Sequence, residues 1–555
     1  MTIYSVVSDF NISPFVGYLR RDLGGKSKVI DQSNSAVQTV LMSWSEFPMV
    51  GDAKVDRAVV WTRAESMFPS FLDTLNGNQL NVSKLDSEVE EFLEILESAS
   101  ENLSILWVPL WVRSDFVRGI GIGEYKKGGI NWALQRINNS LIQRASLSGT
   151  LHVLDTFRWL GSTGTAHDPK LWFMGKIPFT NPIFRNAVRD VEAGRRVLDG
   201  QTAKLIVLDL DGTIWGGIVG ELGWSDLAIG GHDHVGEAYS DFQKALKGLS
   251  NHGILLAVVS RNEESIALGA IDSHPEMILC RNDFVGWRIN WNDKAENIAS
   301  LASELNIGLS NIVFIDDQSA ERSRVSEALP EVVVPEWPND PAMFVKALGE
   351  LVVFDSFGVS DEDRQRKSLY DGENSRKASR LSAQSISEWL SKLELIVRCV
   401  PLSQENISRA VQLLNKTNQL NLSTRRLSKE EFLCWSEQDA HECWVFSSKD
   451  RFGDSGLIGL VGLGPCNDGG ILTDYVLSCR VFGRGIEQVL LHFASFRACE
   501  RGWDTLWAEY LPTEKNKPCL EVMSKMLCTD ESNKFRFFCD TKLGVPLPKH
   551  AQLEI

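Results

Sequence analysis

The stretch KLIVLDLDGTIWGG (Lys204–Gly217) is an apolar run that ends in two aspartates, Asp209 and Asp211, followed by a glycine and a threonine. Side chains of a strand alternate between its two faces, but the chain turns where the strand ends, so both carboxylates can reach one point. Two convergent carboxylates attract a divalent cation, and one of them can attack a phosphorus atom once that cation shields the charge. The stretch therefore predicts a phosphate-handling site, although two aspartates at a strand end can also be plain turn formers.

Three later features favour the phosphate site. Ser260 ends the apolar run Ile254–Val259. Lys294 opens a helical pattern, and the pair Asp316-Asp317 follows a further apolar run. Strands that are apolar throughout and alternate with helices predict a parallel sheet covered on both faces. Ligands of such sheets bind outside the carboxyl ends of the strands, where these side chains would gather with Asp209. Carboxylates there would hold Mg²⁺, while hydroxyl and ammonium groups would bind phosphoryl oxygens.

This order of residues resembles the motifs of the haloacid dehalogenase (HAD) phosphotransferases. The resemblance implies a doubly wound parallel sheet and a role for each matching position: Asp209 as nucleophile and Mg²⁺ ligand, Asp211 as acid/base and as a ligand through its backbone carbonyl, Thr213 and Ser260 as phosphoryl contacts, Lys294 as the orienting cation, and Asp316 and Asp317 as further Mg²⁺ ligands. A lysine at a helix start can also be an ordinary surface residue. Its place among the other motifs favours the catalytic role.

The composition argues against several classes of function. A chain of 555 residues is too long for one core, so several domains are expected. Its net charge of −16 argues against binding to nucleic acid and to anionic membranes. The segment Met1–Phe15 has no basic leader, and no apolar run approaches about 18 residues, so neither a signal peptide nor a membrane span is expected. The ten cysteines form no C-x-x-C spacing, and free thiols fit a reducing cytoplasm, which is the expected location.

The sequence predicts a multidomain α/β protein. Its expected parts are an α/β domain at 1–200, the HAD domain at 201–350, a charged helical linker at 351–390 and an α+β domain at 391–555. Strands of the first part are expected at Thr2–Ser8, Val37–Trp44, Arg57–Trp61 and Leu103–Val112. Ser8, with Asp9 and Asn11, resembles the first block of SGNH hydrolases, but no Asp-x-x-His pair follows. We therefore expect an SGNH-like or flavodoxin-like domain that acts as a scaffold or docking domain rather than as a hydrolase.

The last part has its own motif, SCRVFGRG (Ser478–Gly485), directly after a predicted strand and at the start of a predicted helix. It resembles the pyrophosphate loop of GCN5-type N-acetyltransferases (GNAT). The resemblance implies that the loop binds the phosphates of coenzyme A or of a phosphopantetheine arm through Arg480, Gly483, Arg484 and Gly485. Cys479 lies beside the loop, where a nearby helix N-terminus and guanidinium can favour a reactive thiolate. The alternative for Cys479 is a small residue that only packs the strand end.

Several motifs together resemble the FkbH-like proteins, in which a HAD domain is fused to a GNAT-like domain. The motifs are Trp215-Gly216-Gly217, Arg288–Trp291 (RINW), Asn415–Leu422 (NKTNQLNL), Arg451–Gly456 (RFGDSG) and Ser478–Gly485. The resemblance implies a glyceryl transferase/phosphatase of polyketide-type biosynthesis. Such an enzyme takes 1,3-bisphosphoglycerate, removes phosphate with Mg²⁺ and delivers a glyceryl unit to the phosphopantetheine thiol of an acyl carrier protein, with Cys479 as the thiol of a covalent intermediate.

Three alternatives remain open at this point. The chain could be a HAD phosphatase of another phosphorylated metabolite or macromolecule, with a degenerate C-terminal domain. It could be a CoA-dependent N-acetyltransferase with a regulatory HAD domain. It could also be a scaffolding protein.

Overall fold

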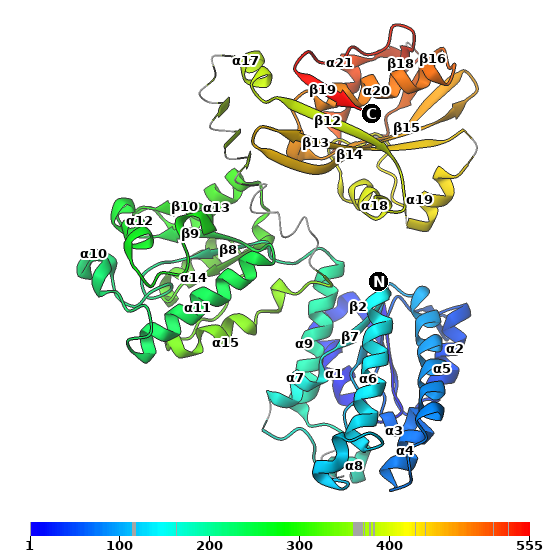
Figure 1. The fold of residues 1–555 in the computed structure, drawn as a ribbon, viewed down its shortest axis with the longest axis vertical. Coiled ribbons are helices and arrows are strands. Elements are labelled where there is room, and N and C mark those ends of the chain that lie inside the picture. The colour runs from blue at the N-terminus through cyan, green and yellow to red at the C-terminus, as the bar shows by residue number, and fades with distance from the viewer. Residues whose placement is uncertain are drawn as a thin grey trace. The chain divides into compact units, whose positions relative to one another are not determined.

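The computed structural model describes residues 2–113, 118–162, 164–358, 370, 372–373, 375–376, 379–380, 383, 385–427, 429–438, 440–513, 515–530 and 532–555. The chain divides into two compact units, Met1–Ala203 with Lys346–Gly358, and Lys204–Val345 with Val359–Ile555. Three larger sheets run through these units (Figure 1). The predicted α/β multidomain fold class is confirmed, and each sheet is described by itself below.

The first unit is a three-layer α/β structure. Its sheet has the parallel order β2-β1-β5-β6-β7, built from β1 (Thr2–Val7), β2 (Ser27–Gln32), β5 (Arg57–Val60), β6 (Ile105–Pro109) and β7 (Leu151–Leu154). One face packs against α2 (Val37–Glu46), α4 (Pro69–Leu75), α5 (Val82–Glu101) and α6 (Ile130–Leu147). The other packs against α1 (Ser13–Leu23), α7 (Thr156–Gly161) and α9 (Asn181–Leu198). Short elements complete the unit: β3 (Met49–Val50), β4 (Ala53–Lys54), α3 (Ala64–Met67) and α8 (Pro169–Gly175). This strand order is the flavodoxin-like one.

The predicted strand at Val37–Trp44 is wrong, because this segment is the helix α2. Its buried residues are Val37, Leu41 and Trp44. Spacings of four and three place these side chains on one face of a helix, whereas a strand would bury alternate residues. The other three strands predicted in this part are confirmed as β1, β5 and β6.

The second sheet, which carries the predicted HAD motifs, has the parallel order β10-β9-β8-β11. Its strands are β8 (Leu205–Leu208), β9 (Leu255–Ser260), β10 (Phe284–Ile289) and β11 (Ile312–Ile315), and its helices are α10 (Val219–Leu222), α11 (His234–Asn251), α12 (Glu264–Ser273), α13 (Lys294–Leu305), α14 (Ser319–Ala328) and α15 (Phe344–Gly349). Helix α13 begins at Lys294 because the Asp293 carboxylate accepts the N–H groups of Ala295 and Glu296. That cap fixes the position from which Lys294 extends.

The third sheet is mixed, with the order β17-β18-β16-β15-β14-β13-β12-β19. Its strands are β12 (Leu395–Pro401), β13 (Glu442–Asp450), β14 (Gly453–Cys466), β15 (Gly469–Leu477), β16 (Thr505–Glu509), β17 (Cys528–Asp530), β18 (Asn533–Asp540) and β19 (Ala551–Glu554). The helices around it are α17 (Ile386–Ser391), α18 (Ile407–Lys416), α19 (Lys429–Ser436), α20 (Ile486–Glu500) and α21 (Lys517–Met526). Strands β12 to β15 form an antiparallel meander, whereas β15 and β16 are parallel.

Much of the predicted linker, 351–390, lies outside the described residues. Its first part packs with the first unit, where Ala203 donates its N–H to the carbonyl of Val353 (2.8 Å). Glu373 and Arg376, further along, make ion pairs with the C-terminal sheet region. The limits of the four predicted domains stay predictions.

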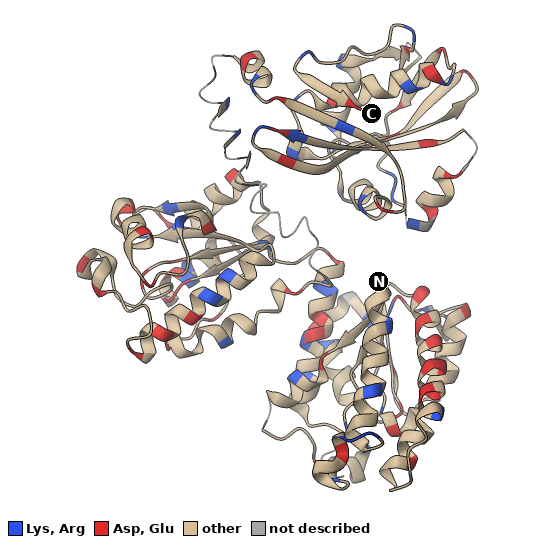
Figure 2. Ribbon diagram, viewed as in Figure 1, with Lys and Arg blue, Asp and Glu red and all other residues tan. Residues whose placement is uncertain are grey.

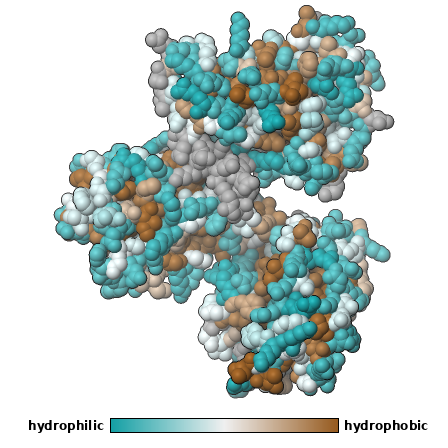
Figure 3. Space-filling view, viewed as in Figure 1, coloured by the Kyte–Doolittle hydropathy of each residue, from teal (hydrophilic) through white to brown (hydrophobic). Residues whose placement is uncertain are grey.

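The surface is mixed in charge and hydropathy. Helix α5 carries a row of acidic residues that is visible in Figure 2: Asp86, Glu88, Glu90, Glu91, Glu94, Glu97 and Glu101. At the end of the first unit where α8 lies, hydrophobic colour reaches the surface (Figure 3), and Phe173 and Met174 of α8 are exposed there. Among the described residues, no helix has both the length and the apolar character needed to span a membrane.

Candidate active site

The predicted HAD residues meet at the carboxyl edge of the second sheet. Asp209 follows β8, Ser260 is the last residue of β9, and Asp316 follows β11. Asp209 donates its N–H to the carbonyl of Ile315 (3.0 Å), which joins the ends of β8 and β11. All three side chains are nearly inaccessible to solvent. This is the edge at which parallel α/β sheets bind ligands.

Lys294 lies between two of these carboxylates. Its Nζ is 3.2 Å from Asp209 Oδ2 and donates to Asp316 Oδ2 at 2.6 Å, and the lysine is only 2% exposed. Lys294 is therefore not a surface lysine. Burial alone would lower the pKa of Lys294, but the two carboxylates raise it above its ordinary value, so the side chain is an ammonium.

Burial raises the pKa of Asp209 to about 6; Lys294 works against this shift and the neighbouring Asp316 adds to it. Burial and Asp316 likewise raise the pKa of Asp317. Excess negative charge is thus concentrated at this point, and one ammonium does not fully offset it. Such a site favours a bound cation.

The donor set fits a divalent metal ion. Carboxylate oxygens of Asp209, Asp316 and Asp317 lie within 4.8 Å of one another. In the part of the chain that the structure describes, Asp209 Oδ1 and Asp317 Oδ1 are buried and have no hydrogen-bond partner. Buried carboxylate oxygens without partners are costly, and a hard cation such as Mg²⁺ prefers ligands of this kind. These residues are therefore the ones that would hold Mg²⁺.

The carboxylate of Asp211 is held apart from that group. Its Oδ1 accepts hydrogen bonds from Trp215 Nε1 (2.8 Å) and Val219 N (3.1 Å), and its Oδ2 accepts one from Asn262 Nδ2 (2.9 Å). Asn262 also donates to Ser260 Oγ (3.3 Å). These three hydrogen bonds fix the orientation of the carboxylate, which is not part of the cluster formed by Asp209, Asp316 and Asp317. The predicted ligation through the Asp211 backbone carbonyl stays a prediction.

The turn that follows the two aspartates is tightly packed. Thr213 is fully buried, and its Oγ1 accepts the N–H of Asp317 (3.2 Å). Gly212 has φ +71°, and a Cβ there would lie 2.6 Å from Asp317 Oδ2. The glycine therefore serves both the left-handed turn and the close approach of Asp317.

Sequence reasoning missed two side chains that hold the site. Asn262 is one of them, and its only signal is its position two residues after Ser260. The other is Arg322 on α14, whose Nη1 donates to the carbonyls of Asp316 (2.9 Å) and Asp317 (2.8 Å). A long side chain that ties down two backbone carbonyls leaves no pattern in a single sequence.

Replacing Asn262 by alanine should lower kcat for Mg²⁺-dependent hydrolysis of p-nitrophenyl phosphate by roughly tenfold or more, with KM little changed. The reason is that Asp211 loses the donor that fixes its Oδ2. Asn251→Ala, at the end of α11 on the surface, is the matched control and should behave as the wild type. An Asn262→Ala enzyme with unchanged kcat would show that Asp211 does not need this orientation.

The N-terminal serine does not present a nucleophile. Ser8 is fully buried, and its Oγ accepts the N–H of Phe10 (3.2 Å). The Asp9 carboxylate binds the backbone N–H and the Nε of Arg63, both at 2.9 Å. Asn11 donates its Nδ2 to the carbonyl of Gly175 (3.1 Å). These contacts give the three residues partners within the fold, and the expected absence of hydrolase chemistry stays a prediction.

In the C-terminal domain, Cys479 follows β15 and is exposed. The neighbouring loop residues are engaged within the chain. Gly483 donates its N–H to Glu487 Oε1 (2.5 Å), and Arg484 is 4% exposed and pairs with Glu373 (2.6 Å). Arg480 donates its Nε to Ser478 Oγ (3.2 Å). Cys479 thus lies at the start of the loop, and three of the predicted binding residues, Arg480, Gly483 and Arg484, already donate hydrogen bonds within the chain.

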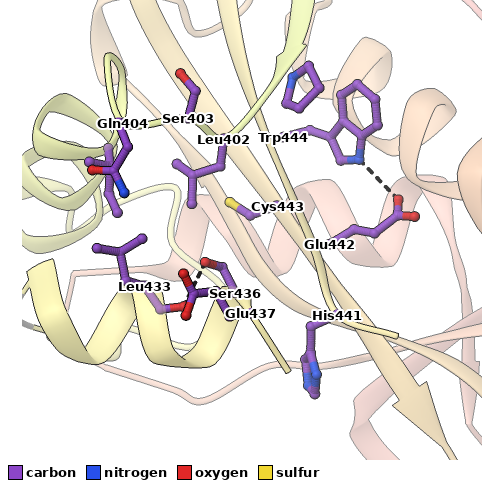
Figure 4. Close-up of a pocket in the computed structure, with 12 residues that line it drawn as sticks. Leu402, Ser403, Gln404, Leu433, Ser436, Glu437, His441, Glu442, Cys443 and Trp444 are labelled. Atoms are coloured by element: carbon purple, nitrogen blue, oxygen red, sulfur yellow. Dashed lines mark hydrogen bonds between the residues drawn. The ribbon is translucent and has the colours of Figure 1, made fainter. Parts of the chain in front are cut away.

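A separate cavity of about 460 Å³ lies beside the start of β13 (Figure 4). Cys443 lines it and is buried, and that burial raises the pKa of its thiol well above its ordinary value. Glu442, next to it, accepts a hydrogen bond from Trp444 Nε1 (3.0 Å). A thiol held in its neutral form is a poor nucleophile, so this cavity does not compete with Cys479.

Comparison with known proteins gives a structural likeness. No family model matches the chain, and none of the curated proteins resembles it in sequence. The N-terminal part of the protein BF1531 from Bacteroides fragilis, a crystal structure containing a phosphatase domain complexed with Mg, is similar to this chain with a TM-score of 0.56 and 22% identity. The match covers 64% of this chain and 94% of that one, and it shows a shared fold.

Two acetyltransferase structures each match 26% of the chain at low scores. The spermidine N-acetyltransferase from Vibrio cholerae, in complex with CoA and spermine, gives a TM-score of 0.21 at 14% identity, with 96% of that chain covered. The ribosomal-protein-S18-alanine N-acetyltransferase from Escherichia coli gives 0.19 at 11%, with 90% covered.

Proposed function

We propose that the chain is a Mg²⁺-dependent phosphotransferase whose second sheet carries the reaction. The observation that carries this proposal is the pair of buried, unpartnered oxygens on Asp209 and Asp317 beside the ammonium of Lys294. A bound Mg²⁺ would supply charge neutralisation, so that an anionic phosphate can approach an anionic carboxylate. The fold shared with a Mg-complexed phosphatase structure supports the proposal.

In the proposed reaction, an oxygen of Asp209 attacks the phosphorus, the bond from phosphorus to the leaving alcohol breaks, and an aspartyl phosphate forms. Asp211, oriented by Trp215 and Asn262, gives its proton to the leaving oxygen. Water then cleaves the acyl phosphate and restores the Asp209 carboxylate, with Asp211 taking up a proton from that water. Lys294 and the hydroxyls of Thr213 and Ser260 bind the phosphoryl oxygens.

We propose further that the substrate is 1,3-bisphosphoglycerate and that the glyceryl unit passes to the phosphopantetheine thiol of an acyl carrier protein. In this step a thiolate attacks the acyl phosphate carbonyl, a thioester forms and inorganic phosphate leaves. The HAD site removes the remaining phosphate. Between Asp209 and Ser260 the chain forms the four-residue helix α10, a single 3₁₀ turn and α11. Because an insertion this small forms no large lid over the site, it supports a substrate that is attached to a large partner such as a carrier protein.

Cys479 is the proposed thiol of the intermediate glyceryl-enzyme. It is exposed at a strand end, whereas burial raises the pKa of Cys519 to about 12 and raises the pKa of Cys443 well above its ordinary value. The carrier's thiol then attacks the enzyme thioester, and the glyceryl unit moves to the carrier with release of the Cys479 thiolate.

The proposal is tested by intact-protein mass spectrometry of a carrier protein incubated with the full chain, 1,3-bisphosphoglycerate and Mg²⁺. A glyceryl increment on the carrier is expected. Phosphate release without that increment would favour a phosphatase of another substrate and would reject the transfer step. In the same assay Cys479→Ala should lose transfer, whereas Cys499→Ala, another exposed cysteine, should keep it. Full transfer by Cys479→Ala would remove the covalent step.

A further inference from the structure

The parallel strands β15 and β16 separate partway along their length. They pair only from Gly470 to Leu472 and from Leu506 to Ala508, although β15 continues to Leu477. A parted pair of strands exposes backbone N–H and C=O groups to which an extended ligand can add as a further strand. The SCRVFGRG loop follows β15 directly, so a CoA-like ligand with its phosphates on the loop would lie along this edge.

That edge is occupied by the chain itself. Leu422 donates its N–H to the carbonyl of Tyr475 (3.1 Å), and Leu477 donates its N–H to the carbonyl of Leu420 (2.9 Å). Asn421 is thereby paired with Val476 in antiparallel fashion. On the other side, Leu511, just past β16, donates its N–H to the carbonyl of Leu422 (3.1 Å). The segment Leu420–Leu422 therefore bridges the two strands where they part.

The segment is anchored from inside. Leu420, Asn421 and Leu422 are each at most 1% exposed. The Asn421 side chain donates to the carbonyls of Leu414 (3.2 Å) and Thr417 (3.1 Å), and its own carbonyl accepts a hydrogen bond from Asn516 Nδ2 (3.2 Å). Releasing the segment would expose two leucines and leave several buried polar groups without partners, which is costly. It is part of the folded core rather than a loose cover.

A backbone N–H group of the loop that could bind an anion is also engaged within the chain. The carboxylate of Glu487, in the first turn of α20, accepts the N–H of Gly483 at 2.5 Å and is 4% exposed. Burial raises the pKa of Glu487, but the backbone N–H groups of Gly483, Glu487 and Gly485 favour its ionised form. A carboxylate at a helix N-terminus occupies the position that a phosphate would otherwise take.

The side chain of Arg484 is also engaged within the chain. Its guanidinium pairs with Glu373 (2.6 Å) and lies 3.6 Å from Asp450. Asp450 in turn binds Arg376 through two hydrogen bonds of 2.7 and 2.8 Å. Arg484 and Arg376 are both 4% exposed and Asp450 is 6% exposed. The Nη1 of Arg484 has no hydrogen-bond partner among the described residues, but it is enclosed, so a pyrophosphate could reach this guanidinium only by displacing Glu373. Removing Glu373 would leave the buried charge of Arg484 less well compensated.

We infer that the C-terminal domain does not bind coenzyme A, nor a pantetheine arm, between β15 and β16, because Leu420–Leu422, Glu487 and Glu373 fill the three positions such a ligand needs. This inference revises the predicted binding role of Gly483, Arg484 and Gly485 and argues against a CoA-dependent N-acetyltransferase. It leaves the phosphate chemistry untouched. A carrier arm that reaches Cys479 would meet it at the exposed strand end, outside the sheet.

Hydrogen–deuterium exchange of the full chain, with and without CoA at about 1 mM, tests this inference at a concentration that would saturate a micromolar site. The amides of Leu422 and Leu477 should exchange at least about a hundredfold more slowly than in an unstructured peptide, because both residues are buried and their N–H groups donate to backbone carbonyls. The Gly483 amide, in the exposed loop, reports on the loop itself. Added CoA should not change the exchange rates of these three amides. Slower exchange of the Gly483 amide with CoA, or unprotected exchange of Leu422 and Leu477 without it, would overturn the inference.

Measuring phosphate release by the same sample distinguishes a failure of this inference from a failure of the proposed function. Loss of p-nitrophenyl phosphate hydrolysis would count against the HAD proposal alone. CoA protection of the loop with hydrolysis intact would count against the closed C-terminal domain alone. Asn516→Asp provides an independent check, because it removes the amide donor to the Asn421 carbonyl and should speed exchange at Leu422 while the HAD activity stays unchanged. Unchanged exchange at Leu422 in that variant would contradict the anchoring of the segment.

Discussion

Replacing Asp209 by asparagine should lower the rate of Mg²⁺-dependent phosphate release by at least about a thousandfold. An amide is a far weaker nucleophile than a carboxylate, and the change also removes one of the three carboxylates that would hold the metal. Phosphate release from p-nitrophenyl phosphate and from 1,3-bisphosphoglycerate provides the measurement.

Asp272→Asn is the matched control, since Asp272 lies on α12 of the same sheet region and pairs with Arg281 on the surface. It should keep the wild-type rate. Circular dichroism of both variants would establish that the fold is intact. A folded Asp209→Asn enzyme that releases phosphate at the wild-type rate would rule out an aspartyl phosphate on this residue.

Replacing Lys294 by methionine should destabilise the second sheet by about 3–5 kcal/mol when EDTA is present. The ammonium contacts Asp209 and Asp316, and both carboxylates are almost completely buried. Methionine fills the space but leaves the two negative charges facing each other without a cation. Addition of Mg²⁺ should restore part of the lost stability, because a bound cation replaces some of the missing positive charge.

Thermal unfolding of the variant with EDTA and with Mg²⁺ measures both effects. Lys244→Met is the control, because the pair of Lys244 with Asp241 is exposed on α11 and its loss should leave the unfolding transition unchanged. The Lys294→Met enzyme should also lose most of its phosphatase activity. A transition as stable in EDTA as that of the wild type would show that Lys294 does not neutralise the carboxylates.

The parts that sequence reasoning predicted well share one physical feature. Strands β8, β9 and β11 are buried on both faces, so their apolar runs are uninterrupted, and the polar residue after each run marks the edge of the sheet. Asp209, Ser260 and Asp316 could therefore be placed together without coordinates. The strand predicted at Val37–Trp44 was wrong because a short run rich in apolar and β-branched residues is compatible with a strand as well as with a helix. Only the packing of its side chains decides between the two.

The sequence by itself determined which chemical groups this protein offers: two aspartates at a strand end, a serine, a lysine and an acidic pair, in an order that brings them to one edge of a parallel sheet. Only the tertiary structure decided which of these groups are available. It holds the Asp211 carboxylate with Trp215 and Asn262 and leaves oxygens of Asp209 and Asp317 unpartnered. It also closes the loop at Gly483 and Arg484 through Glu487 and the distant Glu373. The reason is physical: a motif fixes which groups a segment offers, whereas its partners come from segments far away in the chain, and only folding brings them within hydrogen-bonding distance.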